Sequence, residues 1–543
     1  MAVNIPGLIS VIVFYILILV IGIIAARKSR NSNAEDSFVA NRSIGLWLSF
    51  FTITATNIGG GYINGTAEAI AYSGLIWTNA PILYCLSIVL AGVFYAPTMR
   101  RGGYVTMFDP IQRKLGDRAG SLLFFPQLMG DIFWTAAILS ALGSTMSLIL
   151  DLDPVLSIIV STCVAVFYTF IGGLYSVAYT DVIQLICLSV GLIVSCPFAF
   201  FHPSVDLSRV QDTWVGELPT NMIGLYADLC CQLIFGGLSW QAFYQRVLAC
   251  TTPSVARTSS IVAAFCSLLL AIPPAAVGIV GAAADWNATS YDGEVPIPQE
   301  YHSFILPMVL NYLCPLPVAV LGLGVVAAAV MSSADSSVLS SGTIFAKNIY
   351  KDVIRPQASD REVKWILRGG ILVTGTLSCV LAIMVKSVYG LFYLCSDLMY
   401  VILFPQLTCV LWIGFTNTYG SLAGYILSLF LRVAAGDGLL GIPPLIHFPY
   451  YSEADGQLFP FKTLAMIVNF VATISVSALT RHMFRRGWLS TRWDVFNVIK
   501  REEDAKIAEK RGESLMMKER DDGNRDLDYA QNEKMKLKDN DMQ

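Results

Sequence analysis

The chain has 543 residues, of which 55% are hydrophobic and only 14% charged, with a formal net charge of −3. Soluble domains carry roughly 25% charged residues. A soluble protein with a larger hydrophobic core would still need charged and polar residues on its surface, so a large core does not explain the low content of charged residues. The composition therefore predicts an integral membrane protein. The small net charge, without a basic aromatic-rich cluster, argues against a nucleic-acid partner.

Apolar stretches of about 20 residues, long enough to cross roughly 30 Å of hydrocarbon, recur along the chain. We predict an all-α protein with about thirteen transmembrane helices, the first a true span rather than a cleaved signal peptide because it lacks a basic n-region. The expected spans lie near residues 7–26, 46–67, 76–98, 119–149, 155–172, 177–200, 221–248, 256–282, 316–346, 365–386, 389–413, 420–436 and 461–480.

Lys and Arg are unevenly distributed among the connecting loops. They crowd loops 27–42 and 100–118, whereas 283–303 contains neither. Cytoplasmic loops are enriched in these residues, so we place the N-terminus outside the cell and the C-terminus in the cytosol. The sequon at Asn287 falls in a predicted extracellular loop and is the expected glycosylation site.

Two expected spans contain helix-breaking residues at bilayer depth. One broken segment is the run 52–61, with three glycines and several polar residues, and the other is 235–241, with two glycines beside polar and aromatic residues. Glycine costs about 1 kcal/mol in a helix interior relative to alanine. Breaks five helices apart are typical of a five-plus-five inverted repeat with a binding site between the repeats. Close helix packing through small residues is the alternative.

The ninth span carries a hydroxyl cluster that includes Ser332 and Ser333. Sodium is a hard cation that prefers oxygen ligands, and carbonyls freed near Ala55 and Ile58 could complete its shell. The alternative is that each serine bonds back to the carbonyl four residues earlier.

Carboxylates inside a membrane indicate function by default. The candidates are Asp131, Asp181, Asp228, Asp335 and Asp397. Asp181 and Asp335 have polar neighbours, and we expect them to couple an ion. Asp228 and Asp397 could instead lie near an interface or pair with a structural partner such as Arg246.

Three aromatic residues, Tyr84, Trp134 and Trp240, lie on separate helices near the predicted breaks. Converging rings hold a quaternary ammonium, which cannot donate a hydrogen bond, through their quadrupoles. Single buried aromatics are more often core residues. The sequence shows no metal motif, nucleophile elbow or paired catalytic carboxylates, so we do not expect an enzyme.

The segment Gly172–Asp181 resembles the signature of the sodium/solute symporter family. Four further segments resemble the choline-carrying members of that family, over a match from about residue 7 to 496. These segments are Gly60–Ala69, Tyr104–Pro110, Trp240–Leu248 and Val330–Ser337.

This resemblance implies a leucine-transporter-type fold. Residues 1–45 would form an added N-terminal helix and loop, 46–413 a transporter core of two inverted repeats, and 414–496 added C-terminal helices. The tail, 497–543, lies outside the match; its density of both charges and scarcity of aromatics predict a flexible cytosolic segment. The resemblance also implies that the protein lies in the plasma membrane, with synaptic or endosomal vesicles as alternatives. Transport would depend on sodium and chloride, and the protein could form an oligomer.

The resemblance further implies site residues. One sodium site would use carbonyls of Ala55, Ile58 and Ala329 with hydroxyls of Ser332 and Ser333. A second would involve Asp181 and Asp335. The choline cage would use Tyr84, Trp134, Trp240 and a tryptophan in the first broken helix.

The chain departs from that pattern at Asn57, which occupies the position of the expected tryptophan and resembles the sugar-carrying relatives. Asparagine offers donors and an acceptor but no ring face, so a cation could lose about 1–2 kcal/mol of binding there. We therefore expect a symporter of choline or a related cation. The alternatives are a symporter of another small polar solute and a sodium or ligand sensor that does not transport.

Overall fold

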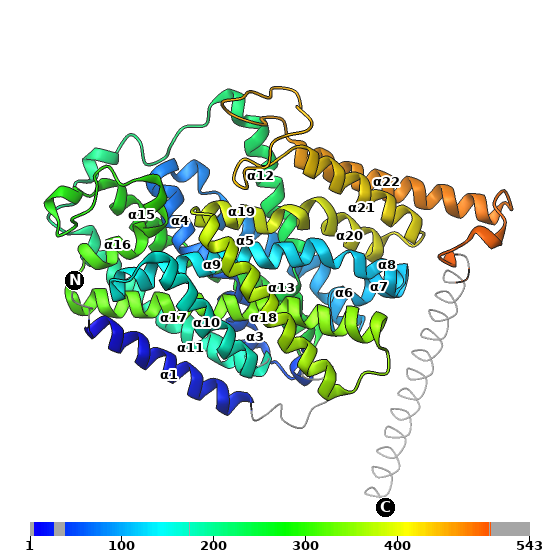
Figure 1. Cartoon of the computed structure of the whole chain (residues 1–543), viewed down its shortest axis with the longest axis horizontal. Coiled ribbons are helices and arrows are strands. Elements are labelled where there is room, and N and C mark those ends of the chain that lie inside the picture. The colour runs from blue at the N-terminus through cyan, green and yellow to red at the C-terminus, as the bar shows by residue number, and fades with distance from the viewer. Residues whose placement is uncertain (1–4, 27–37, 173, 499, 501–543) are drawn as a thin grey trace, which may run out of the picture.

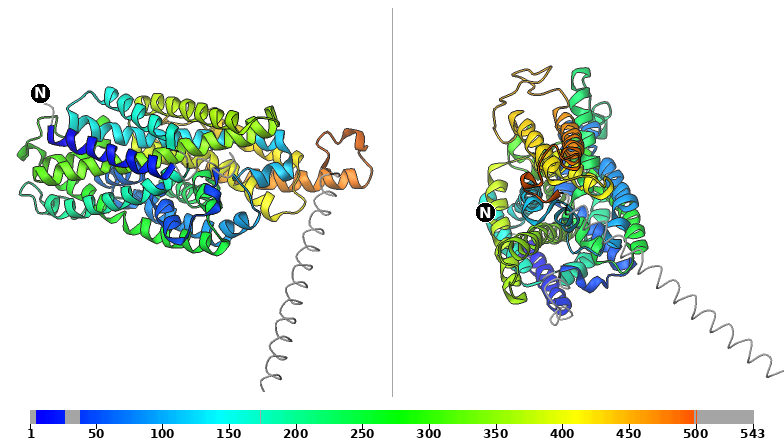
Figure 2. Two further views of the ribbon diagram at one scale, coloured as in Figure 1. Left: turned by 90° about the horizontal axis from the view of Figure 1, so that it is seen from below. Right: turned by 90° about the vertical axis from the view of Figure 1, so that its right-hand side faces the viewer.

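The computed structural model describes residues 5–26, 38–172, 174–498 and 500. This part of the chain is helical, with four isolated β-bridges and no named strand, so the predicted all-α class is confirmed. The long helices run roughly side by side along the longest axis of the molecule (Figures 1 and 2).

Helices occupy every range in which the sequence predicts a span. Some ranges hold one helix: α1 (Ile5–Ala26), α10 (Pro154–Gly172), α11 (Leu174–Phe200), α17 (Leu316–Ile344), α18 (Asp360–Met384), α21 (Thr418–Ala434) and α22 (Phe461–Arg485). Others hold consecutive segments: α3 (Leu46–Asn57) with α4 (Gly60–Ser73), α5 (Ala80–Leu90) with α6 (Ala96–Arg101), α8 (Asp117–Leu122) with α9 (Phe124–Leu150), α12 (Ile223–Gly236) with α13 (Gln241–Ala249), α14 (Pro253–Leu269) with α15 (Ile272–Ala283), and α19 (Val388–Leu398) with α20 (Phe404–Trp412). Two short helices, α7 (Asp109–Leu115) and α16 (Ile305–Tyr312), lie in the connections.

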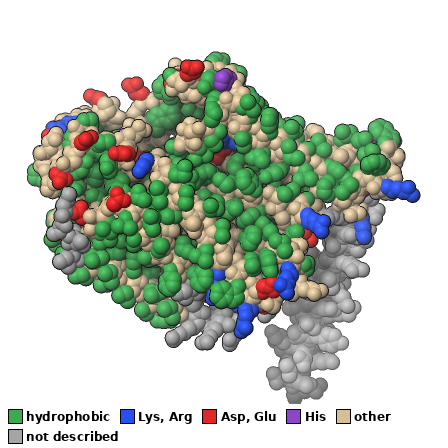
Figure 3. Space-filling model, viewed as in Figure 1, with side chains coloured by type: hydrophobic (Ala, Val, Ile, Leu, Met, Phe, Trp, Pro, Cys, Tyr) green, Lys and Arg blue, Asp and Glu red, His purple; other side chains and the backbone are tan. Residues whose placement is uncertain are grey.

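Nine helical stretches among the described residues are long and apolar enough to cross a membrane. Large apolar side chains on the outer faces are exposed, as on α1, where Val13 and Ile24 are 58% and 60% exposed. Figure 3 shows apolar side chains over most of one face, with charged residues mainly towards its edges. Exposed apolar surface of this extent indicates contact with lipid, which makes this a multi-pass membrane protein. The count of thirteen spans stays a prediction.

Both predicted helix breaks are present. Helix α3 ends at Asn57, Ile58 and Gly59 leave the helical conformation, and α4 begins at Gly60. Helix α12 ends at Gly236 and a single 3-10 turn follows, after which Trp240 is extended (φ −110°, ψ 119°) where α13 begins. Non-helical backbone at membrane depth is tolerated where it lies inside protein, and the residues at both breaks are largely buried.

Helix α17 contacts α9, α11, α18, α1 and α3, and lies next to α1 in Figure 1. It therefore places the Ser332–Asp335 segment beside the first broken helix. Helices α21 and α22 pack on each other at one side of the bundle.

The buried carboxylates near α22 have structural partners. The Asp397 carboxylate forms ion pairs with the Arg432 guanidinium at 2.6 Å and with the Lys462 ammonium at 3.2 Å. Asp228 accepts the backbone N–H groups of Lys462 and Thr463, at the start of α22. The prediction that Arg246 could pair with Asp228 or Asp397 is wrong, because the salt-bridge partner of Arg246 is Asp181. Asp228 and Asp397 thus anchor the C-terminal helices to the core.

Candidate ion and solute site

The end of α3 supplies backbone oxygen atoms to α17. The last four carbonyls of a helix have no partner within it, and the carbonyl of Ala55 accepts a hydrogen bond from the Ser333 hydroxyl at 3.0 Å. Ile58 occupies the break itself, directly after Asn57. Carbonyl and hydroxyl oxygens therefore meet where the helix is interrupted, which is the ligand chemistry that a hard cation prefers.

Gly59 joins this oxygen cluster to the aromatic residues. A Cβ atom added at Gly59 would lie 2.8 Å from Cβ of Ser333 and 3.1 Å from the Trp134 ring. Both distances are shorter than ordinary van der Waals contact, so only glycine fits without displacing a neighbour. The backbone at Gly59 is wedged between the ion-binding candidate Ser333 and the cage candidate Trp134.

Asp181 lies at the centre of a second polar cluster. Its carboxylate accepts hydrogen bonds from Ser332 and Thr52, and Arg246 approaches to 3.7 Å. The side chains of Asp181 and Arg246 are both 0% exposed. A guanidinium therefore already neutralises this buried carboxylate.

Asp335 has fewer partners than Asp181. One carboxylate oxygen accepts a hydrogen bond from Thr169 at 2.5 Å. The other, Oδ2, is buried and has no hydrogen-bond partner in the described part of the chain. An unsatisfied buried carboxylate oxygen is costly, which fits an atom available to a cation.

The structure thus brings most of the expected ion ligands into two neighbouring clusters. Ala55 contacts Ser333, and Asp181 contacts Ser332. Ala329 lies on α17 one turn before these serines, with its side chain outside the described residues.

The aromatic candidates pack against one another inside the bundle. The Trp134 and Trp240 ring centroids are 5.2 Å apart with an interplanar angle of 87°, and those of Tyr84 and Trp240 are 6.2 Å apart. Asn57 borders the same enclosure because its Oδ1 accepts a hydrogen bond from the Tyr84 hydroxyl at 3.4 Å. All four side chains are buried.

Sequence reasoning missed a fourth ring, Phe392 of α19. Its centroid lies 5.2 Å from that of Trp134 and 6.3 Å from that of Tyr84. Tyr389, Phe392 and Tyr393 recur at helical spacing, so the aromatic face could have been noticed. Only the packing of α19 on α9 shows that Phe392 points to the cage.

Asp131 also has a role that its sequence context does not reveal. Its Oδ1 accepts the indole N–H of Trp240 at 3.0 Å, while Oδ2 accepts from the hydroxyls of Ser340 and Ser341. Asp131 is fully buried. Its carboxylate therefore lies at the N–H edge of the Trp240 ring and fixes the orientation of that ring.

The remaining sequence predictions concern the ends of the molecule. Asn287 is the middle residue of the short Trp286–Ala288 turn and is exposed, so glycosylation there stays a prediction that its exposure permits. Residues 501–543, nearly all of the expected flexible tail, lie outside the described residues.

Two interrupted helices, a buried oxygen cluster and an enclosed aromatic site within a lipid-facing bundle define a secondary transporter that couples an ion to a solute. A model of the sodium:solute symporter family matches residues 37–428. The chain belongs to this family, so it is a transporter rather than an enzyme.

Two similar proteins are named high-affinity choline transporter 1. The one from Drosophila melanogaster is 50% identical over 502 residues, covering 92% of this chain and 82% of the relative. The human one is 48% identical over 517 residues, covering 92% and 89%. A solved Na+-coupled sialic acid symporter in a substrate-bound outward-open state superposes with a TM-score of 0.72 at 18% identity, covering 87% of this chain and 97% of that one. These likenesses confirm the predicted leucine-transporter-type fold.

The buried pair of Asp181 and Arg246 leads to a stability prediction. Arg246→Met should lower the free energy of unfolding by about 3–5 kcal/mol, because it leaves a buried carboxylate without its cation. The double variant Arg246→Met/Asp181→Leu should regain much of this loss, since replacing both charges with apolar residues can be nearly neutral. The thermal midpoint of the detergent-solubilised protein measures both effects. If the double variant instead loses the sum of the unfolding free energies that the two single variants lose, the two charges do not stabilise each other.

Proposed function

We propose that the chain imports choline or a closely related organic cation across the plasma membrane, driven by sodium and dependent on chloride. The observation that carries this proposal is the buried enclosure of Tyr84, Trp134, Trp240 and Phe392, whose neighbouring centroids lie 5.2 to 6.3 Å apart. The names of the two similar choline transporters support the same substrate.

The enclosure suits a quaternary ammonium for a physical reason. Such a cation has no N–H to donate, so ring faces are its best partners, worth up to about 2 kcal/mol each when water is excluded. Trp134 and Trp240 are in edge-to-face contact, so the two rings would have to separate before their faces could bound two sides of one small cation. Asp131 adds negative charge at the N–H edge of Trp240.

Asn57 favours a solute that also carries a hydrogen-bond acceptor. Its Nδ2 is buried and has no hydrogen-bond partner within the described ranges. A choline hydroxyl could accept this hydrogen bond. The same feature supports the second candidate, a sodium-coupled symporter of another small polar solute.

For sodium, we propose one site formed by the carbonyls of Ala55, Ile58 and Ala329 with the hydroxyls of Ser332 and Ser333. The hydrogen bond between Ser333 and Ala55 supports it, because the two oxygens are already adjacent. A second position would use Asp335, whose Oδ2 is unpartnered among the described residues, together with Asp181.

Transport would follow an alternating-access cycle. The cage side chains are buried, so solute can reach them only when the repeats move relative to each other. Each sodium ion entering at −70 mV would contribute about 1.6 kcal/mol from voltage and about 1.4 kcal/mol from a roughly tenfold gradient.

The proposal also includes the arrangement of the chain in the membrane. Residues 46–413 would form the moving core, and 1–45 and 414–496 would flank it. The N-terminus and glycosylated Asn287 would lie outside the cell and the tail in the cytosol. Vesicle membranes are an alternative location, and the protein could form an oligomer.

The substrate proposal is tested by uptake of labelled choline into proteoliposomes. An inward sodium gradient should drive accumulation above equilibrium, and Trp240→Ala should abolish it because the cage loses a ring. Tyr419→Phe, a change outside the cage, is the matched aromatic control. Sodium-dependent binding without accumulation would indicate a sensor. Preferential uptake of a neutral polyol would favour the second candidate.

The sodium site is tested by removing single hydroxyls. Ser333→Ala should raise the sodium concentration for half-maximal uptake by about tenfold, because a ligand oxygen is lost. Ser195→Ala is the control, since that buried hydroxyl bonds back to Gly191 on α11. The measurement is choline uptake as a function of sodium at constant ionic strength. An unchanged sodium curve would remove Ser333 from the site.

A further inference from the structure

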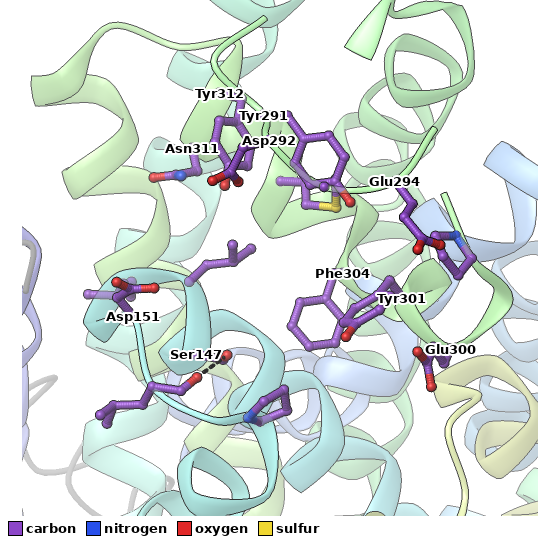
Figure 4. A pocket seen from close by; sticks show the side chains of 17 residues that line it. Ser147, Asp151, Tyr291, Asp292, Glu294, Glu300, Tyr301, Phe304, Asn311 and Tyr312 are labelled. Atoms are coloured by element: carbon purple, nitrogen blue, oxygen red, sulfur yellow. Dashed lines mark hydrogen bonds between the residues drawn. The ribbon is translucent and has the colours of Figure 1, made fainter. Parts of the chain in front are cut away.

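A second cavity lies away from the cage, at the end of the molecule that carries Asn287. It has a volume of about 700 Å³ and lies between the end of α9, the loop that follows the Trp286–Ala288 turn, and α16 (Figure 4). Ser147 at its floor follows Trp134 on α9 by more than three helical turns, or about 20 Å. We call this cavity the outer pocket.

Aromatic rings line two parts of the outer pocket. Tyr291 and Tyr312 have ring centroids 5.6 Å apart, as do Tyr301 and Phe304. In Figure 4 the two pairs lie on different sides of the open space. The pocket volume falls within the roughly 300–1,000 Å³ typical of small-molecule sites.

The charge of the outer pocket has one sign. Its lining includes Asp151, Asp292, Glu294 and Glu300, and none of the described lining residues is Lys, Arg or His. Within the described ranges none of these four carboxylates has an ion-pair partner. Lys386 lines an adjoining cavity with Glu300 and Tyr301, but the outer pocket itself keeps a lining of one sign, and such a cleft concentrates ions of the other sign.

The carboxylates of the outer pocket also affect the pKa of its tyrosines. Burial raises the pKa of the Tyr312 phenol, and the nearby carboxylates of Asp292 and Asp151 raise it further. The pKa of Tyr291 is raised by burial, by the neighbouring tyrosines and by Asp292 and Glu294. These upward shifts agree with the acidic lining of the pocket.

The arrangement does not suit a metal ion. Among the described residues there is no group of three or more His, Cys, Asp or Glu side chains placed to hold one. The carboxylates are instead spread around a wide cavity with rings between them (Figure 4). Ring faces combined with dispersed negative charge are the chemistry that recognises an organic cation.

We propose that the outer pocket is a second, low-affinity site for a quaternary ammonium, which the cation occupies before it reaches the cage. This inference rests on the proposed function, because it takes the transported solute to be such a cation that arrives from outside. Its physical effect would be to raise the local concentration of solute at the outer face.

The test is equilibrium binding of labelled choline to the full chain in nanodiscs, at constant sodium and low ionic strength. Trp240→Ala disables the cage, so that binding to the outer pocket can be measured alone. We expect weak, saturable binding that tetramethylammonium displaces. Adding Asp292→Asn and Glu300→Gln should weaken it roughly tenfold, because two of the four carboxylates are removed.

Matched variants separate ring and charge effects from misfolding. Tyr301 is 39% exposed, so substitutions there should spare the fold. Tyr301→Leu should weaken the residual binding, whereas Tyr301→Phe should preserve it because a ring face remains. Glu453→Gln removes an exposed carboxylate outside the pocket and should change nothing.

The result that overturns the outer pocket is absent residual binding, or residual binding that the pocket variants leave unchanged. The proposed function fails by a different result, namely the absence of sodium-driven choline accumulation by the unmodified chain. Because binding to the cage-disabled protein does not require transport, the two failures can be told apart.

Discussion

A helix interrupted inside hydrocarbon leaves backbone groups that lipid cannot bond, and much of this structure is arranged around that constraint. The break after Asn57 is placed in the interior of the bundle, where the Ser333 hydroxyl bonds to the carbonyl of Ala55. Helix α17 must therefore lie directly against α3. Its position also determines where Ser332 meets Asp181.

The same break connects the two parts of the candidate site. Gly59 contacts both Ser333 and Trp134 with no space for a side chain. A shift of α17 at Ser333 would therefore also press on the backbone that packs against Trp134. In the proposed transport cycle this contact would link the sodium site to the aromatic cage.

Charge in the interior follows a consistent pattern. Asp181 is neutralised by Arg246, Asp397 by Arg432 and Lys462, and Asp131 is surrounded by donors from Trp240, Ser340 and Ser341. Asp335 is left with one oxygen unpartnered among the described residues. The outer pocket differs because its carboxylates are exposed, so water rather than a protein partner can solvate them.

The sequence by itself determined the membrane class, the helical ranges and both helix breaks, because hydrophobic length and interior glycines act locally along the chain. It also marked Tyr84, Trp134, Trp240, Ser332 and Ser333 as residues of interest. Tertiary structure decided what each side chain contacts, since that depends on how helices distant in sequence pack. Only packing shows that Phe392 completes the ring enclosure and that Asp131 holds Trp240. Packing also decided that Arg246 neutralises Asp181 and that loop carboxylates gather with tyrosines in the outer pocket.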